Sequence, residues 1–145
     1  MEARKNLKWL SVLVLALAAF TFVRVIVQTF CVEFNAVTLP EGATEGVILA
    51  AQIILCVVSL ILLLPQIYVG VKGVKVAKTP DRSKAHIVWA MILAVIGILG
   101  LISPISNMIE AKNILDNLFT LLDLASDVLV YIAYVVYAKQ VLKAA

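Results

Sequence analysis

Four long apolar stretches dominate the chain, and short polar connections separate them. They cover residues 9–30, 46–69, 87–107 and 118–137. At about 1.5 Å per residue, each is long enough to cross the roughly 30 Å hydrocarbon core of a bilayer as a helix. Strands are not expected, because isolated strands leave backbone groups without hydrogen bonds in lipid. The pattern predicts an all-α integral membrane four-helix bundle, with residues 1–145 forming a single four-span transmembrane domain.

The overall composition agrees with this prediction. Hydrophobic residues make up 63% of the chain and charged residues 14%, with a mean hydropathy of +1.08. Soluble domains contain about 45–50% apolar residues, so the bilayer is expected to be the main solvent. The net charge of +3 would suggest nucleic-acid binding in a soluble protein. Here the basic residues cluster at segment ends, which membrane topology explains, so we expect no nucleic-acid partner.

The distribution of the basic residues predicts the orientation of the spans. They lie before the first span, after the fourth, and in the connection 70–86, which we expect to be a basic cytoplasmic loop. These residues are Arg4, Lys5, Lys8, Lys72, Lys75, Lys78, Arg82, Lys84, Lys139 and Lys143, whereas the other two connections contain only Lys112. Cytoplasmic loops carry the excess of lysine and arginine. We therefore expect both termini in the cytoplasm and localisation in the cytoplasmic (inner) membrane.

Two proline motifs predict where the third helix begins and ends. Thr79-Pro80-Asp81 has the pattern of a helix start, with Thr79 as N-cap, Pro80 at the first helical position and Asp81 against the helix dipole. Ser103-Pro104 lies near the other end of the same helix. Proline removes a backbone hydrogen bond, so a kink or an early stop is expected there.

Three ionisable residues lie inside the apolar segments. Arg24 comes six residues before Phe30, while Asp123 and Asp127 come five and nine residues after Leu118. Such groups cost roughly 2.5–3.5 kcal/mol each within a bilayer and usually face a partner or a watery cavity. In antiparallel spans the three reach a similar depth in the outer half of the membrane. We expect Arg24 to bridge to either aspartate, in the two-pronged geometry that guanidinium favours.

Polar residues recur every three or four positions on three of the segments, which places them on one helix face each. On the fourth segment this face includes Thr120 and Tyr131 together with the aspartates. Gln28 follows Arg24 on the first segment, and Gln52 reaches the same layer from the second. The predicted ligand or ion-binding site consists of Arg24, Gln28, Gln52, Thr120, Asp123, Asp127 and Tyr131.

The charges of this site leave two functional interpretations open. One cation and two carboxylates give one uncompensated negative charge, which a proton, a bound cation or water could satisfy. The leading prediction is binding or transport of a proton, a cation or a small polar ligand, with Arg24 as the counter-charge or as the anchor for a ligand's carboxylate. The alternative is a non-catalytic structural or accessory subunit of a membrane complex, whose Arg24–Asp pair holds helices together.

Other functions are less favoured by the sequence. No nucleophile is paired with a base, and His86 is the only histidine, so we expect no catalytic residues, no metal and no cofactor; His86 itself is expected at the membrane interface. The basic residues at 72, 75, 78, 82 and 84 are expected to contact anionic lipid head groups. Ala90, Ala94, Gly97 and Gly100 form a small-residue patch on the third segment, which packs either inside the bundle or between protomers of a homo-oligomer.

Overall fold

The computed structural model describes residues 2–31, 45–79, 83–110 and 114–144, and these fold almost entirely into helices. The helices are α1 (Glu2–Cys31), α2 (Glu45–Lys78), α3 (Ala85–Gly100), α4 (Ile102–Ile109) and α5 (Ile114–Lys143). Four runs are long and apolar enough to cross a membrane: Glu2–Val27, Gly46–Lys78, Ala85–Ile109 and Asn117–Lys143. The third of these runs joins α3 and α4. The all-α prediction is therefore confirmed for the described part of the chain.

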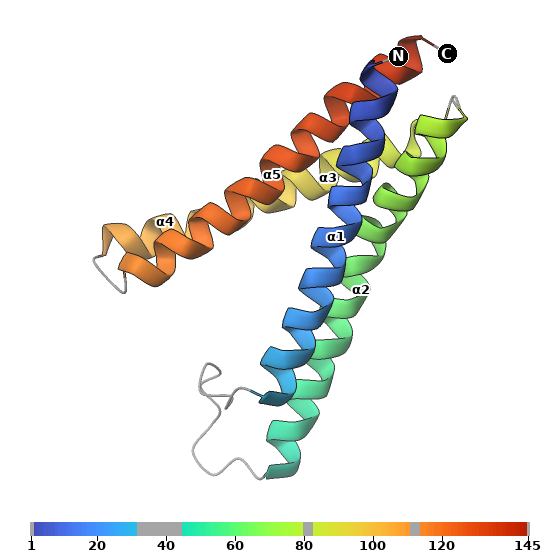
Figure 1. The fold of residues 1–145 in the computed structure, drawn as a ribbon. Coiled ribbons are helices and arrows are strands. Elements are labelled where there is room, and N and C mark those ends of the chain that lie inside the picture. The colour runs from blue at the N-terminus through green and yellow to red at the C-terminus, as the bar shows by residue number, and fades with distance from the viewer. Residues whose placement is uncertain (1, 32–44, 80–82, 111–113, 145) are drawn as a thin grey trace.

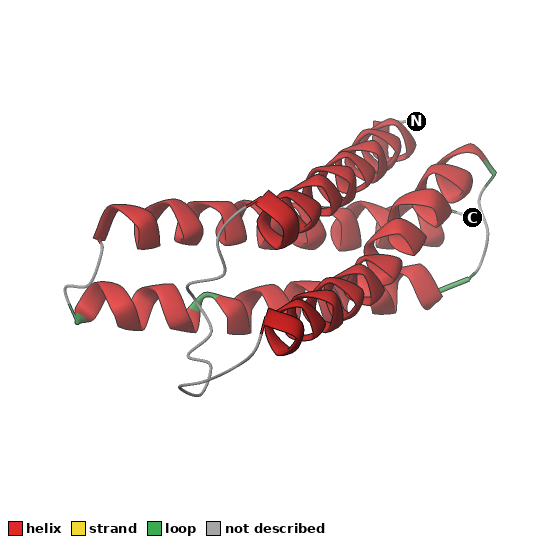
Figure 2. Ribbon diagram, turned by 90° about the horizontal axis from the view of Figure 1, so that it is seen from below, coloured by secondary structure: helices red, strands yellow, loops and turns green. Residues whose placement is uncertain are grey.

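The helices form two hairpins that meet at one end and diverge toward the other (Figure 1). One hairpin pairs α1 with α2, and the second pairs α5 with α3 and α4. Both chain termini lie where the hairpins meet. The view from below shows that the hairpins point in different directions away from this end (Figure 2). We call the end with the termini the closed end of the bundle and the opposite side the open end.

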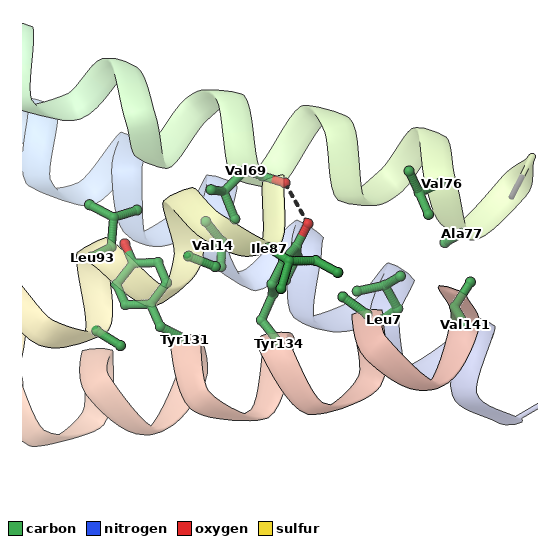
Figure 3. Close-up of a cluster of buried hydrophobic side chains, with 13 residues drawn as sticks. Leu7, Val14, Val69, Val76, Ala77, Ile87, Leu93, Tyr131, Tyr134 and Val141 are labelled. Carbon is green, nitrogen blue, oxygen red and sulfur yellow. Dashed lines mark hydrogen bonds between the residues drawn. The ribbon is translucent and has the colours of Figure 1, made fainter. Parts of the chain in front are cut away.

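Nearly all of the buried side chains belong to the closed end. The main cluster contains Leu7, Val14, Val69, Val76, Ala77, Ile87, Ala90, Leu93, Ala94, Tyr131, Tyr134, Ala138 and Val141 (Figure 3). The hydroxyl of Tyr134 donates a hydrogen bond to the carbonyl oxygen of Val69 over 3.0 Å, which joins α5 to α2. The hydroxyl of Ser11 is also buried and donates to the carbonyl oxygen of Leu7 over 2.6 Å. The helix backbones thus satisfy both of these buried hydroxyls.

The segment 70–86 is not the loop expected from its lysines, because α2 continues to Lys78. Gly70 and Gly73 are buried, and a Cβ atom at Gly73 would collide with the hydroxyls of Ser11 and Tyr134. These glycines therefore allow α1 and α5 to approach α2 closely, which is a packing role and not a turn. Packing against α1 and α5 keeps the basic stretch 70–78 helical. The charge pattern alone does not predict this packing.

The helix start predicted at Thr79 is also wrong. The amide of Thr79 donates to the carbonyl oxygen of Lys75 over 2.8 Å, so Thr79 closes the end of α2. The next helix begins at Ala85, and Lys84 at its N-cap position makes no side-chain capping hydrogen bond. The residues 80–82 of the proposed start motif lie outside the described residues.

The interruption expected near Ser103-Pro104 is confirmed. Helix α3 ends at Gly100 and α4 begins at Ile102. The amide of Leu101 is shared between the carbonyl oxygens of Gly97 and Ile98, at 3.2 and 3.1 Å. Pro104 has no amide hydrogen to donate one turn back, which weakens the helix at this point.

The small-residue patch of α3 packs inside the chain. Ala90 and Ala94 are buried, and a Cβ atom at Gly97 would lie 2.6 Å from a methyl carbon of Val128 on α5. Small residues let helices approach closely without a hydrophobic driving force. Ala90, Ala94 and Gly97 therefore face the inside of the chain, whereas Gly100 is exposed. The homo-oligomer stays a prediction.

Candidate functional site

The first candidate site is an ion pair that joins the two hairpins. Nη1 of Arg24 on α1 lies 2.9 Å from Oδ2 of Asp123 on α5, within hydrogen-bond distance. The similar depths of the two residues in the sequence predicted this pairing. The structure has one contact in place of the two-pronged geometry that was expected. The side chains remain 48% and 52% exposed, so the protein does not shield the pair from its surroundings.

The ion pair lies in an open cleft of about 490 Å³ between α1 and α5. The residues lining the cleft are Phe20, Arg24, Phe119, Thr120, Leu122, Asp123 and Ser126. They present one carboxylate, one guanidinium, two hydroxyls and two phenyl rings. The Ser126 hydroxyl donates to the carbonyl oxygen of Leu122 over 2.7 Å, which leaves its oxygen lone pairs available. Such a lining offers complementary contacts to a small ligand that has a charged group and an apolar part.

Asp127 lies one helical turn after Asp123 and is partly buried. It does not line the cleft, and within the described ranges no hydrogen bond or ion pair joins it to another residue. The single guanidinium contact of Arg24 goes to Asp123. Asp127 is therefore the carboxyl group of the predicted site that forms no ion pair in the described part of the chain.

The other predicted site residues do not gather around the cleft. Thr120 lines it, whereas Gln52 is partly buried on α2 and does not. Tyr131 is only 4% exposed and belongs to the core of the closed end. The side chain of Gln28 lies outside the described residues. Of the seven predicted residues, the structure brings Arg24, Thr120 and Asp123 together at the cleft.

Sequence reasoning missed the remaining residues of the lining, above all Ser126 and the two phenylalanines. Phe20 and Phe119 each lie four residues before a charged residue of the pair, and Ser126 lies three after Asp123. Residues at these spacings share a helix face. The helical spacing could have revealed all three residues. The phenylalanines were missed because they are apolar, and Ser126 was missed because the polar face was continued from Asp123 through Asp127.

A second group of polar side chains is buried at the closed end. His86 is 1% exposed, contrary to its expected interfacial position. Its ring meets the ring of Tyr134 edge to face, with centroids 6.0 Å apart and an interplanar angle of 87°. This geometry is favourable for aromatic rings. Oε1 of Gln66 is also buried, with no hydrogen-bond partner among the described residues. His86 and Gln66 contribute to packing, and neither lines the cleft between α1 and α5.

No group of three or more histidine, cysteine, aspartate or glutamate side chains in the described part of the chain is arranged to hold a metal ion. Comparison with protein-family models, curated proteins and solved structures finds no match for the chain.

Proposed function

We propose that this chain is a small multi-pass membrane protein that binds a small polar or cationic ligand in the cleft between α1 and α5 and carries it across the membrane. The observation that supports this proposal is the half-exposed Arg24–Asp123 pair in that cleft. Charges next to apolar helices in a membrane are costly unless water or a polar partner reaches them. A cleft that admits water also admits a small polar ligand.

The lining favours an organic cation. The carboxylate of Asp123 accepts hydrogen bonds from an ammonium group, and the hydroxyls of Thr120 and Ser126 can orient it. Phe20 and Phe119 attract a cation through their ring faces and cover its apolar part. The uncompensated carboxylate of Asp127, one turn away, adds a favourable negative potential. For a bare metal ion, one carboxylate and two hydroxyls are a poor set of oxygen ligands. The lining suits a cation with an apolar part better.

Binding of a cation at Asp123 would compete with Arg24. The Arg24–Asp123 ion pair links α1 to α5 at the cleft. When a ligand replaces the guanidinium, the two hairpins lose this link and their separation becomes easier. Ligand binding would then shift the equilibrium between two arrangements of the hairpins, as transport requires.

We also propose that the protein lies in the cytoplasmic membrane with both termini in the cytoplasm. The basic residues near both termini and at the end of α2 all belong to the closed end of the bundle, as a cytoplasmic side requires. Reporter fusions at each terminus that fluoresce only in the cytoplasm test this orientation. Two fluorescent fusions are expected, and a dark fusion at either terminus would contradict it.

The ligand proposal is tested by thermal melts of the purified protein in detergent. The panel contains sodium, potassium, tetramethylammonium, alkylammonium ions and a pH series. A ligand at about 100 times its dissociation constant stabilises the folded state by about 2.7 kcal/mol, which corresponds to a shift of roughly 5–10 °C for a chain of this size. The largest shift is expected with an alkylammonium ion.

Three variants assign the shift to the cleft. Asp123→Asn should lose it, and Asp127→Asn should weaken it by removing the surplus charge. Glu2→Gln removes an exposed carboxylate far along α1 from the cleft and should keep the full shift. If no cation or pH changes the melting temperature of the wild-type protein, the proposal is wrong.

One feature favours the alternative of a structural subunit, because the ion pair joins the two hairpins. In that case Asp123→Asn would lower the melting temperature equally under every condition. A ligand-dependent shift in the wild-type protein that Asp123→Asn abolishes would contradict the structural interpretation.

A further inference from the structure

An apolar groove of about 350 Å³ lies between α2 of one hairpin and α3 of the other. Ile61, Leu64, Pro65 and Tyr68 line it from α2, and Trp89 lines it from α3. Pro65 has no amide hydrogen for the carbonyl oxygen of Ile61 one turn before, and its ring occupies that place in the helix. The groove therefore lies at an irregular point of α2, next to two aromatic side chains of the type found at membrane interfaces.

Two lysines extend the same face of α2 toward the closed end. Lys72 and Lys75 follow Tyr68 by four and seven residues, and this spacing keeps them on the face that lines the groove. From Ile61 to Lys75 the helix rises about 21 Å at 1.5 Å per residue. The face thus changes along its length from an apolar groove to a pair of basic side chains, of which Lys75 is exposed.

We propose that this face binds one anionic phospholipid, with an acyl chain in the groove and the phosphate at Lys72 and Lys75. The inference rests on the membrane placement proposed above and is independent of the ligand in the cleft. An acyl chain gains little from an apolar groove, because lipid tails surround it in either place. Selectivity must therefore come from the head group. A lysine close to an anionic membrane surface favours binding by roughly fivefold.

The two tryptophans of the chain provide a direct test. Trp89 lines the groove, whereas Trp9 lies on α1 beside other lysines and does not line it. In Trp9→Phe, Trp89 is the only tryptophan, and in Trp89→Phe only Trp9 remains. Each variant is reconstituted in vesicles of phosphatidylcholine that contain either brominated phosphatidylglycerol or brominated phosphatidylcholine, at equal mole fractions. Bromine on an acyl chain quenches a tryptophan that it touches.

The proposal predicts that brominated phosphatidylglycerol quenches Trp89 with an apparent affinity about fivefold or more above that of brominated phosphatidylcholine. The preference at Trp9, which reports general enrichment of anionic lipid near basic residues, should be clearly smaller. Lys72→Gln combined with Lys75→Gln should lower the preference at Trp89 to the value at Trp9. Lys5→Gln combined with Lys8→Gln is the matched control and should leave the preference at Trp89 unchanged.

Leu64→Phe provides a second variant that keeps all charges and partly fills the groove. It should reduce quenching of Trp89 by both brominated lipids, and the helical circular-dichroism signal shows whether each variant is folded. Equal preference at Trp89 and Trp9 overturns the lipid site but leaves the membrane placement intact. Absence of quenching at both tryptophans by either lipid overturns the placement and the lipid site together.

Discussion

The closed and open ends of this molecule are built from the same four helical runs, yet they treat polar groups differently. At the closed end, the hydroxyls of Ser11 and Tyr134 are buried and donate to backbone carbonyl oxygens. At the open end, Arg24 and Asp123 pair with each other and stay half exposed. The closed end satisfies these two hydroxyls from the helix backbones, although Oε1 of Gln66 has no partner among the described residues. The open end leaves charge accessible to water or to a ligand.

Side-chain size accounts for this difference. Where the hairpins meet, Gly70, Gly73 and Ala90 are buried and let the helices approach closely. Where the hairpins diverge, the residues around the ion pair are large, and Phe20 and Phe119 remain 64% and 69% exposed. The bulky residues cannot pack as closely as the glycines do. Close approach of the helices therefore coincides with Gly70, Gly73 and Ala90, and the open cleft coincides with the two exposed phenylalanines.

The largest effect on stability is expected for Gly73→Ala, which disrupts the closest helix contact of the closed end. The added Cβ atom would meet the hydroxyl of Ser11 and the ring of Tyr134, neither of which has free space in the core. Overpacking of this kind costs about 1–3 kcal/mol. Thermal melts in detergent should show a lower melting temperature for this variant.

Gly46→Ala is the matched control, because nothing lies within 4 Å of a Cβ atom at that position. Alanine favours a helix over glycine by up to about 1 kcal/mol, so this variant should be as stable as the wild type or more stable. Equal melting temperatures for the two variants would contradict the close approach of α1, α2 and α5.

A smaller effect on stability is expected for alanine substitutions on α3, at Gly97 and Gly100. A Cβ atom at Gly97 would lie 2.6 Å from Val128, whereas one at Gly100 would lie 3.7 Å from Leu124. Gly97 lies inside α3 and Gly100 is its last residue, so alanine gains at least as much helix propensity at Gly97. A lower stability of Gly97→Ala must therefore come from packing. We expect Gly97→Ala to be less stable than Gly100→Ala by about 1 kcal/mol. The opposite order in thermal melts would contradict the close approach of α3 and α5 at Gly97.

The sequence predicted the helices better than their packing. The apolar runs predicted four helices that are long and apolar enough to cross a membrane, because length and hydropathy act locally. The pairing of Arg24 with Asp123 followed from their predicted depths in antiparallel helices. The burial of Tyr131 in the core and the distance of Gln52 from the cleft did not follow. Helical spacing shows which residues share a face, but the angle between two helices determines whether those faces meet, and that angle depends on side-chain packing over the whole bundle.

The smallest effect is expected for the ion pair itself, measured by a double-mutant cycle of Arg24→Gln and Asp123→Asn. Because both side chains are about half exposed, with values of 48% and 52%, surrounding water or ligand should screen most of their attraction. Polar contacts between membrane helices average about 0.6 kcal/mol, and exposed ion pairs contribute less than about 1 kcal/mol.

The coupling energy should therefore stay below about 1 kcal/mol, even though each single change leaves a charge without its partner. A dry, enclosed pair would behave differently, since loss of one partner of a buried ion pair costs about 3–5 kcal/mol. Thermal melts of the two single variants and the double variant distinguish these cases. A large coupling energy would mean that the open end shields its charges as the closed end does, and it would favour the structural role of the pair over ligand binding.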